Sequence, residues 1–285
     1  IRFNIPEVTK PNLLIIVGSI FFVIFTLLVG TSKMAFSQEI VFVGSFMIIL
    51  FLLFKLSNEL DANAKKMLIG TAIIIFVFRA MPGVGQGGSW FEIDVLGFDQ
   101  EFLSLLGLIA SFLTILGIFV LRPLMEKSSM TRLIVILSIA GSFFILPSIA
   151  MFYGFHEFTS KFTNGFVDAR FIAIFNTALE SPLGQVSMIP ILAWIAQSAP
   201  NHLKATFFAV LASFTNLALS ASNLGTKYLN QIYVITREVK NDMGIIKTPA
   251  DYSELGVLLI IVCALTLTVP ILVTYIVKKL KLLSY

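Results

Sequence analysis

Residues 255–278, LGVLLIIVCALTLTVPILVTYIVK, form an apolar run that carries no charge before its last residue, Lys278. A transmembrane helix needs about 20 predominantly apolar residues to cross the hydrocarbon core of a bilayer. Seven further apolar stretches approach or exceed this length: residues 12–30, 39–55, 67–81, 102–121, 132–153, 169–198 and 205–225. The sequence therefore predicts an all-α, polytopic membrane helix bundle with about eight transmembrane helices.

The composition supports the same class. Of the 285 residues, 57% are hydrophobic and only 13% are charged, and the mean hydropathy is +0.94. Soluble domains carry about 25% charged residues, so this chain has too few charges to cover a surface exposed to water. We expect an integral, multi-pass membrane protein with the lipid bilayer as its surroundings.

Several function classes are not indicated. One cysteine, Cys263, excludes a disulfide framework within the chain, and two histidines leave little for a metal site. The chain has neither an H-E-x-x-H motif nor a Walker A lysine motif, so neither a zinc hydrolase nor an ATP-driven pump is supported. We expect no enzyme, no cofactor, no metal and no nucleic-acid partner.

Basic residues gather in alternate loops. The 55–66 loop, the 122–132 loop and the C-terminal tail are rich in Lys and Arg, whereas the 82–101 loop carries carboxylates without Lys or Arg. The positive-inside rule then puts the N-terminus, the 55–66 loop and the tail on the cytoplasmic side. The chain starts IRFNIPEVTK, without an initiator Met or the features of a signal peptide, and we expect that N-terminal helices of the same protein are missing.

The sixth stretch is too long for one straight span and is polar in its middle. Residues 175–190, FNTALESPLGQVSMIP, carry Asn176, Glu180 and Gln185 beside Pro182 and Gly184. Pro182 cannot donate to the carbonyl four residues earlier and predicts a break there. Intramembrane carboxylates are functional candidates by default, and broken helices are where secondary transporters build their sites. A structural pair with a neighbouring helix is the alternative for Glu180.

Arg79 lies near the outer end of the third stretch. It is either an anion-binding group that faces a water-filled cavity or a side chain that reaches the membrane surface along its aliphatic stem. The segment that follows, GVGQGG at 83–88, formally matches a dinucleotide-binding pattern. That pattern requires a strand before it, whereas here an apolar helix is expected. We interpret the segment as a flexible loop or an unwound helix end.

The seventh stretch presents one face of small and polar residues. These residues follow at steps of four, four, three and four: Ala205, Ala209, Ser213, Asn216 and Ser220. Such a face lets membrane helices pack closely, and Asn216 offers a hydrogen bond to a ligand as the alternative. The polar 226–254 segment that follows predicts a short helix or a hairpin over the outer mouth.

Two long blocks of the sequence resemble the folate–biopterin transporter family, and within it the cyanobacterial and plastid-like members. They are FRAMPGVGQGGSWFEIDVLGFDQEF at 78–102 and LESPLGQVSMIPILAWIAQSAPNHLKATFFAVLASFTNLALSASNLGTKYLNQI at 179–232. The resemblance runs from about residue 56 to the end. It implies the major facilitator fold, with two six-helix halves, and transport of folates or pterins coupled to protons.

On this resemblance, residues 1–55 would be the last two helices of an N-terminal half and 56–66 the central cytoplasmic loop. Residues 67–285 would be the C-terminal six-helix half. Many family members carry an acidic residue one turn before the glutamate, where this chain has Asn176. The resemblance therefore leaves Glu180 as the main titrating candidate. It also implies a plasma membrane or a plastid envelope as the location.

The resemblance implies a role for each candidate residue. Glu180 would bind the pterin or the proton, and Asp94 would act in the outer gate or in proton coupling. Arg79 and Lys227 would bind the anionic tail of a folate, and neutral hydrogen bonds would come from Asn176, Gln185 and Asn216. Two alternatives stay open, which are a carrier of the same superfamily for another organic anion and a membrane subunit that does not itself transport.

Overall fold

The computed structural model describes residues 13–32, 34–197, 204–241 and 246–282. In these residues the chain is mostly helical. The first helices are α1 (Leu13–Gly30), α2 (Ser37–Ser57), α3 (Ala62–Arg79), α4 (Gln86–Asp94), α5 (Gln100–Val120), α6 (Arg122–Lys127), α7 (Met130–Phe152) and α8 (Phe155–Phe162). They are followed by α9 (Ala169–Glu180), the 3-10 turn η1 (Ser181–Leu183), α10 (Met188–Gln197), α11 (Lys204–Ile232), β1 (Val239–Lys240), β2 (Ile246–Thr248) and α12 (Leu255–Lys279).

Side-chain caps fix where several long helices begin. The carboxylate of Asp61 accepts hydrogen bonds from the backbone N–H groups of Asn63 and Ala64 at the start of α3. Asp99 and Asp168 cap α5 and α9 in the same way. Each cap satisfies backbone donors that the first helical turn leaves without a partner. The helices therefore start at short polar side chains that the sequence places between the apolar stretches.

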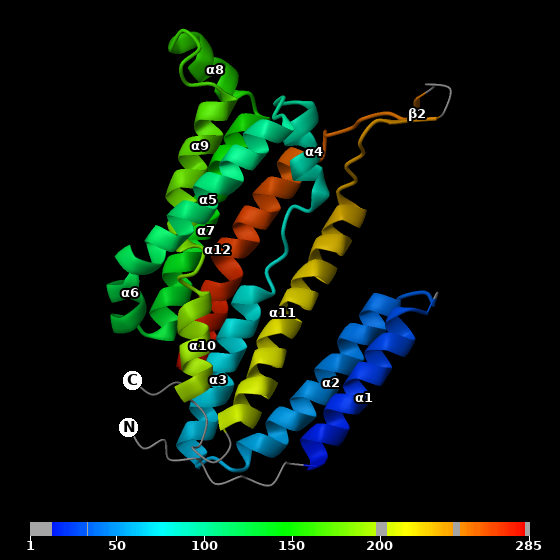
Figure 1. Ribbon diagram of the computed structural model, residues 1–285, viewed down its shortest axis with the longest axis vertical. Helices are drawn as coiled ribbons and strands as arrows, with labels where there is room; N and C mark the ends of the chain where they lie inside the picture. The colour runs from blue at the N-terminus through cyan, green and yellow to red at the C-terminus, as the bar shows by residue number, and fades with distance from the viewer. Residues whose placement is uncertain (1–12, 33, 198–203, 242–245, 283–285) are drawn as a thin grey trace, which may run out of the picture.

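The long helices run alternately up and down and form one bundle (Figure 1). Helices α7 and α12 lie side by side at its centre, and α3 packs against both. Helix α11 packs against α2, α3 and α10, and α5 packs against α9 and η1. The largest apolar core joins α2, α3, α10 and α11 around Ile75, Ile195, Phe207 and Leu211. Helix α1 lies at the edge of the bundle, beside α2.

The observed helices follow the predicted apolar stretches, and the fold class is confirmed as an all-α, multi-pass membrane bundle. Within the described residues, five helices are long and apolar enough to cross a membrane: α2, α5, α7, α11 and α12. Residues Ile16–Gly30 of α1 form a shorter apolar helix. The sixth predicted stretch is divided between α9 and α10. The total of eight spans stays a prediction.

Two predicted loop boundaries were wrong because the helices extend further. Helix α2 continues to Ser57 and α3 begins at Ala62, so Lys65 and Lys66 lie inside a helix rather than in a 55–66 loop. Helix α11 continues to Ile232, past the predicted loop start at 226. The segment after it contains the short antiparallel hairpin of β1 and β2, which is one of the two structures expected there.

The irregular backbone between α3 and α4, which includes Gly83 and Val84, is held against α11, and residues 86–88 of the glycine-rich segment form the first turn of α4. Ser222 donates to the carbonyl of Met81 at 2.6 Å, Gly83 N–H donates to Thr226 at 2.8 Å, and Asn230 donates to the carbonyl of Val84 at 3.1 Å. A helix, and not a strand, precedes the segment, which removes the context of a dinucleotide site. The expected loop or unwound helix end is present at residues 83–85, where hydrogen bonds to α11 fix the backbone, whereas residues 86–88 are helical.

Candidate functional site

The candidate site begins at the interruption between α9 and α10. Helix α9 ends at Glu180, the 3-10 turn holds Pro182, and α10 begins only at Met188. Proline cannot supply an N–H to the carbonyl four residues earlier, and its ring clashes with that carbonyl. Gly184 follows directly after the turn and donates its N–H to the carbonyl of Ser181 at 3.0 Å.

Helix α5 supports this interruption from one side. The hydroxyl of Thr114 donates to the carbonyl of Ser181 at 2.9 Å. In a continuous helix this carbonyl would accept from a backbone N–H of the next turn, so Thr114 replaces that donor. One turn later, Gly117 lies directly against the backbone of Pro182, and a Cβ atom there would overlap the proline carbonyl. Thr114 and Gly117 therefore let α5 approach the irregular backbone closely. The sequence reasoning did not identify either residue.

Glu180 is the last residue of α9, and its side chain is exposed on the bundle. Among the described residues, it has neither a hydrogen-bond partner nor an ion-pair partner. Within these residues the structure gives Glu180 no partner of the kind that the alternative, a structural pair with a neighbouring helix, requires. A carboxylate that is left unpaired within a membrane helix is expensive, and such groups face a polar cavity or a ligand path.

Arg79 is the last residue of α3 and lies across from the start of α10. Its Nη1 atom is 3.2 Å from the sulfur of Met188, and its Nε atom is buried without a hydrogen-bond partner. A thioether is a weak acceptor, and no described carboxylate lies within ion-pair distance of this guanidinium. Arg79 thus brings an uncompensated positive charge to the chain segment that contains the interruption.

The neutral candidates lie in different settings. Asn176 donates its amide to the backbone carbonyl of Phe144 in α7 at 3.3 Å, so one of its donors is already used to join the two helices. Gln185 is half-buried in the interruption, and Asn216 is exposed on α11. In the described part of the chain, neither of these two amides has a hydrogen-bond partner. Both are therefore available to bind a ligand.

Lys227 is not free in the structure. Its ammonium group lies 2.7 Å from a carboxylate oxygen of Glu39 at the start of α2, and Tyr228 donates to the same oxygen at 2.9 Å. The positive charge is thereby compensated within the chain. This ion pair weakens the expectation that Lys227 binds an anionic tail, and it identifies Glu39 as a residue that the sequence reasoning missed.

Asp94 is also paired. Arg237 binds both of its carboxylate oxygens, at 2.7 and 2.8 Å, and the hydroxyl of Tyr252 donates to it at 2.7 Å. The hydrogen bond from Arg237 is the main cause that lowers the pKa of Asp94, while burial and Asp94 together raise the pKa of Tyr252 to about 12. Asp94 is therefore ionised at neutral pH. These contacts join α4 to the segments that carry Arg237 and Tyr252.

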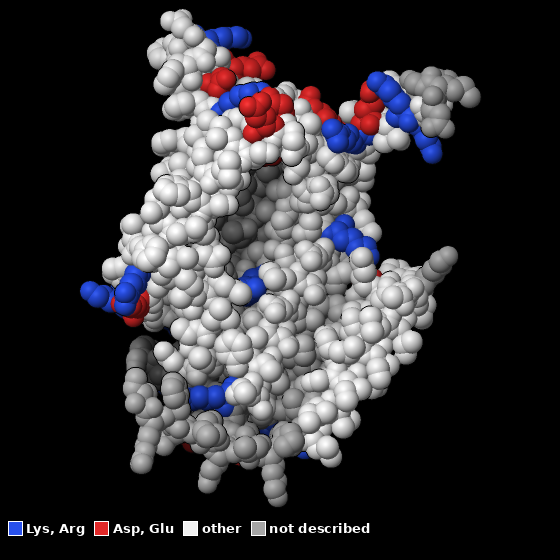
Figure 2. Space-filling view, in the orientation of Figure 1, with Lys and Arg blue, Asp and Glu red and all other residues white. Residues whose placement is uncertain are grey.

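Charged residues and a hollow mark one face of the bundle. Figure 2 shows a deep hollow in the middle of this face, charged residues gathered at its upper end and an isolated basic group near its lower margin. Comparison with Figure 1 places the hollow between α5 and the segment that joins α3 to α4.

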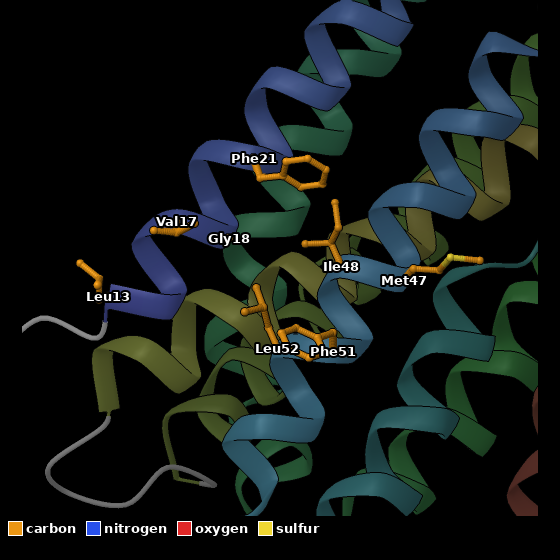
Figure 3. A pocket seen from close by; sticks show the side chains of 8 residues that line it. All are labelled: Leu13, Val17, Gly18, Phe21, Met47, Ile48, Phe51 and Leu52. Atoms are coloured by element: carbon orange, nitrogen blue, oxygen red, sulfur yellow. The ribbon is translucent and has the colours of Figure 1, made fainter.

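A separate groove of about 820 Å³ lies between α1 and α2. Figure 3 shows apolar side chains from both helices around it, among them Phe21, Met47 and Phe51. Its lining contains no charged or hydrogen-bonding side chain. Because an anion needs donors or cations to replace its water, this groove does not suit a charged substrate.

Comparison with known proteins gives two similarities. The model of the BT1 family matches residues 45–284. A curated protein of Synechocystis sp. (strain ATCC 27184 / PCC 6803 / Kazusa), named "Folate-biopterin transporter", is 21% identical over 158 residues, which are 55% of this chain and 31% of that protein. The similarity thus covers less than a third of the relative's length. No solved structure matches.

Proposed function

Because the chain belongs to the BT1 family, a family of membrane transporters, we propose that it is a secondary active transporter of folates or pterins and that it couples their movement to protons. The printed name of the Synechocystis relative supports this substrate class. The observation that carries the proposal is that two charged groups without an ion-pair partner among the described residues flank one interruption. Glu180 ends α9, and Arg79 of α3 contacts Met188 at the start of α10.

The chemistry of the two groups matches the two ends of a folate. The flat pterin presents adjacent N–H donors, and a carboxylate such as that of Glu180 accepts two of them in one plane. The glutamate tail is anionic, and the guanidinium of Arg79 binds both oxygens of a carboxylate. The amides of Gln185 and Asn216 supply neutral hydrogen bonds around the ring. We infer no role in substrate binding for Lys227, whose charge Glu39 already compensates.

Proton coupling would pass through Glu180. Burying a protonated carboxyl group away from water costs less free energy than burying a carboxylate. Closure of the site is therefore favoured when Glu180 is protonated. Pro182 and Gly184 supply the interruption at which α9 and α10 can change their angle. Glu180 would then bind its proton on one side of the membrane and release it on the other.

We further propose the domain division that the resemblance implies. Residues 1–55 would belong to one half of a major facilitator fold and residues 67–285 would form the other half. Residues 56–66 would be the cytoplasmic link between the halves, of which only the residues between Ser57 and Ala62 lie outside α2 and α3. The membrane would be a plasma membrane or a plastid envelope.

Glu180→Gln tests the proposal. We expect this variant to lose uphill accumulation of labelled folate in proteoliposomes with an imposed proton gradient, because glutamine cannot carry a proton. Exchange of labelled for unlabelled folate needs no net proton movement, so it should persist, but with a higher KM because glutamine can accept only one of the two pterin N–H groups. Glu101→Gln is the matched control, because Glu101 lies exposed in the first turn of α5, away from the interruption. Normal accumulation by the Glu180 variant would refute its role in coupling.

The two alternatives give different results in the same assay. Arg79 would bind the carboxylate of any organic anion, so a carrier for another anion remains the second candidate. Unlabelled pterins should compete with labelled folate for a folate or pterin carrier, whereas unrelated anions alone should compete if the second candidate is correct. A protein that moves no folate, pterin or other anion would be a membrane subunit that does not itself transport.

A further inference from the structure

Helix α8 projects from the outer end of the bundle, between α7 and α9 (Figure 1). Left-handed backbone bounds it on both sides, at Gly154 before the helix and at Asn164 and Gly165 after it. Gly165 N–H donates to the carbonyl of Ser160 at 2.7 Å, which closes the last turn in the manner of a C-terminal cap. The sequence therefore builds a separate, well-defined helix here and not a simple connecting loop.

One face of α8 is aromatic and the other is polar. Phe155, Phe158 and Phe162 follow at steps of three and four, which places them on a single helical stripe. Their exposed fractions are 49%, 65% and 82%. Neighbouring rings along the stripe are 6.4 and 6.3 Å apart between centroids. The opposite face carries His156, Glu157, Ser160 and Lys161.

A second row of exposed rings begins four residues after the first and runs along the exposed face of α9. Phe166, which is 72% exposed, lies 5.2 Å from the ring of Phe171, and Phe171 stacks at 6.4 Å on Phe175. On α9 these two rings lie opposite Ala169 and Ala173, which are buried against neighbouring helices. Exposed phenylalanine rings therefore occur both on α8 and on the exposed face of the neighbouring bundle helix.

We propose that α8 lies in the membrane–water interface and inserts its phenylalanine face into the lipid. Phenylalanine rings exposed to this extent are unfavourable in water and favourable at the boundary between headgroups and acyl chains. Figure 2 agrees with this orientation, because the surface over α8 is mostly uncharged on its outer side and carries its charges toward the middle of the molecule. The polar face carries one acidic and one basic side chain, Glu157 and Lys161, so the partner is lipid of no particular headgroup charge.

Spin labels can test the orientation in the full chain. Cys263 is the single cysteine, and Cys263→Ser provides a background to which Phe162→Cys or Glu157→Cys is added. Both positions are exposed and lie on opposite faces of α8. The labelled protein is reconstituted into phosphatidylcholine vesicles. The relaxation of the spin label is then measured in the presence of oxygen, a relaxing agent that concentrates in lipid, and of a nickel chelate, a relaxing agent that stays in water.

We expect a several-fold higher oxygen-to-nickel ratio at position 162 than at position 157. The same ratio should appear at a label introduced by Phe158→Cys, which guards against a local distortion at one site. Adding phosphatidylglycerol to the vesicles should leave the ratios unchanged. Equal ratios on the two faces would overturn the proposal.

A second copy of the chain is the other occupant that the experiment can detect. If the phenylalanine face bound another copy, labels at position 162 would broaden each other's spectra, and dilution with unlabelled protein would remove the broadening. That result would also overturn the proposal. Spectra that do not change on dilution, together with high oxygen accessibility, would support it.

Discussion

In the proposed site, the two charged residues that lack an ion-pair partner among the described residues differ in what they could bind. Arg79 offers two parallel N–H donors and keeps its charge at every relevant pH, while its only described acceptor is the weak sulfur of Met188. Glu180 offers acceptors and can be protonated. Asn176 and Lys227 differ from them because each already uses a polar atom to join two helices.

Arg79→Gln should weaken binding of folate more than binding of a pterin that lacks the anionic tail. A charge-assisted hydrogen bond contributes about 1.5–3 kcal/mol, which corresponds to a roughly 10- to 150-fold increase in KM for folate. Arg79→Lys should restore part of the affinity, because lysine keeps the charge but cannot bind both oxygens in one plane. Uptake kinetics with the two substrates measure this, and equal losses for both would contradict the assignment.

Asp94 gives a prediction about pH. The pKa of Asp94 in the folded protein lies below the usual value, chiefly because Arg237 donates to the carboxylate. The ionised carboxylate therefore stabilises the folded protein in full when the pH is above its unfolded pKa of about 3.9. The contribution is lost only as the pH falls through the lower folded value. The outer end around Tyr252 should therefore keep its structure from pH 8 to about pH 5 and loosen below about pH 4.

Trp90 packs in the same cluster as Tyr252. Its fluorescence emission, measured in a Trp194→Phe background, therefore reports the loosening around Tyr252. Asp94→Asn should show the loosened spectrum already at pH 7, and Glu254→Gln, at an exposed carboxylate nearby, should not. If the Trp90 emission of the protein without the Asp94 substitution changed between pH 5 and pH 7, a group other than Asp94 would control the loosening.

At the scale of elements, the interruption of α9 and α10 depends on its contact with α5. Thr114 satisfies a freed carbonyl and Gly117 leaves room for Pro182. In the same way, Ser222, Thr226 and Asn230 on α11 hold the irregular segment that follows α3. In both places a neighbouring helix supplies the partners, as irregular backbone in a membrane requires.

Gly117→Ala should destabilise the protein by about 1–3 kcal/mol, because the added methyl group forces α5 away from the backbone of Pro182. Gly107→Ala is the matched control on the same helix, since a Cβ atom there meets nothing within 4 Å. It should be neutral or stabilise the helix by up to about 1 kcal/mol. Chemical unfolding in detergent micelles measures both, and equal stabilities for the two variants would contradict the contact.

At the scale of the whole molecule, ion pairs join parts that lie far apart in the sequence. Glu39 and Lys227 connect α2 to α11, Asp94 and Arg237 connect α4 to the segment before the hairpin, and Asp99 and Arg170 connect the starts of α5 and α9. Since α1 packs beside α2 at the edge of the bundle, the contact between α2 and α11 attaches the first two helices to the rest.

The pair of Glu39 and Lys227 should behave as a unit. Lys227→Met leaves a carboxylate without its partner near the end of a membrane helix, and Glu39→Gln leaves the ammonium without its partner, so each single variant should lower the thermal stability. The double variant should be more stable than either single one, because it removes both charges. Arg122→Gln, which opens an exposed ion pair within α6, should have little effect. Additive losses in the double variant would contradict the coupling.

The sequence by itself determined the membrane class, the approximate position of each long helix and the interruption near Pro182. These features are local, because they depend on the length of apolar runs and on the backbone chemistry of proline. The sequence also identified Arg79 and Glu180 as unusual, since a charge in an apolar run is visible without a structure. Its loop boundaries failed where helices continued through polar residues such as Lys65 and Lys227.

Only the tertiary structure decided which of the polar residues are already paired. Glu39 and Lys227 are separated by 187 intervening residues, and nothing in their local sequences relates them. The same holds for Asp94 with Arg237 and for Gly117 with Pro182. Pairing across a bundle depends on which helices become neighbours and on the rotation of each about its axis, and that choice is made by the packing of all the helices together.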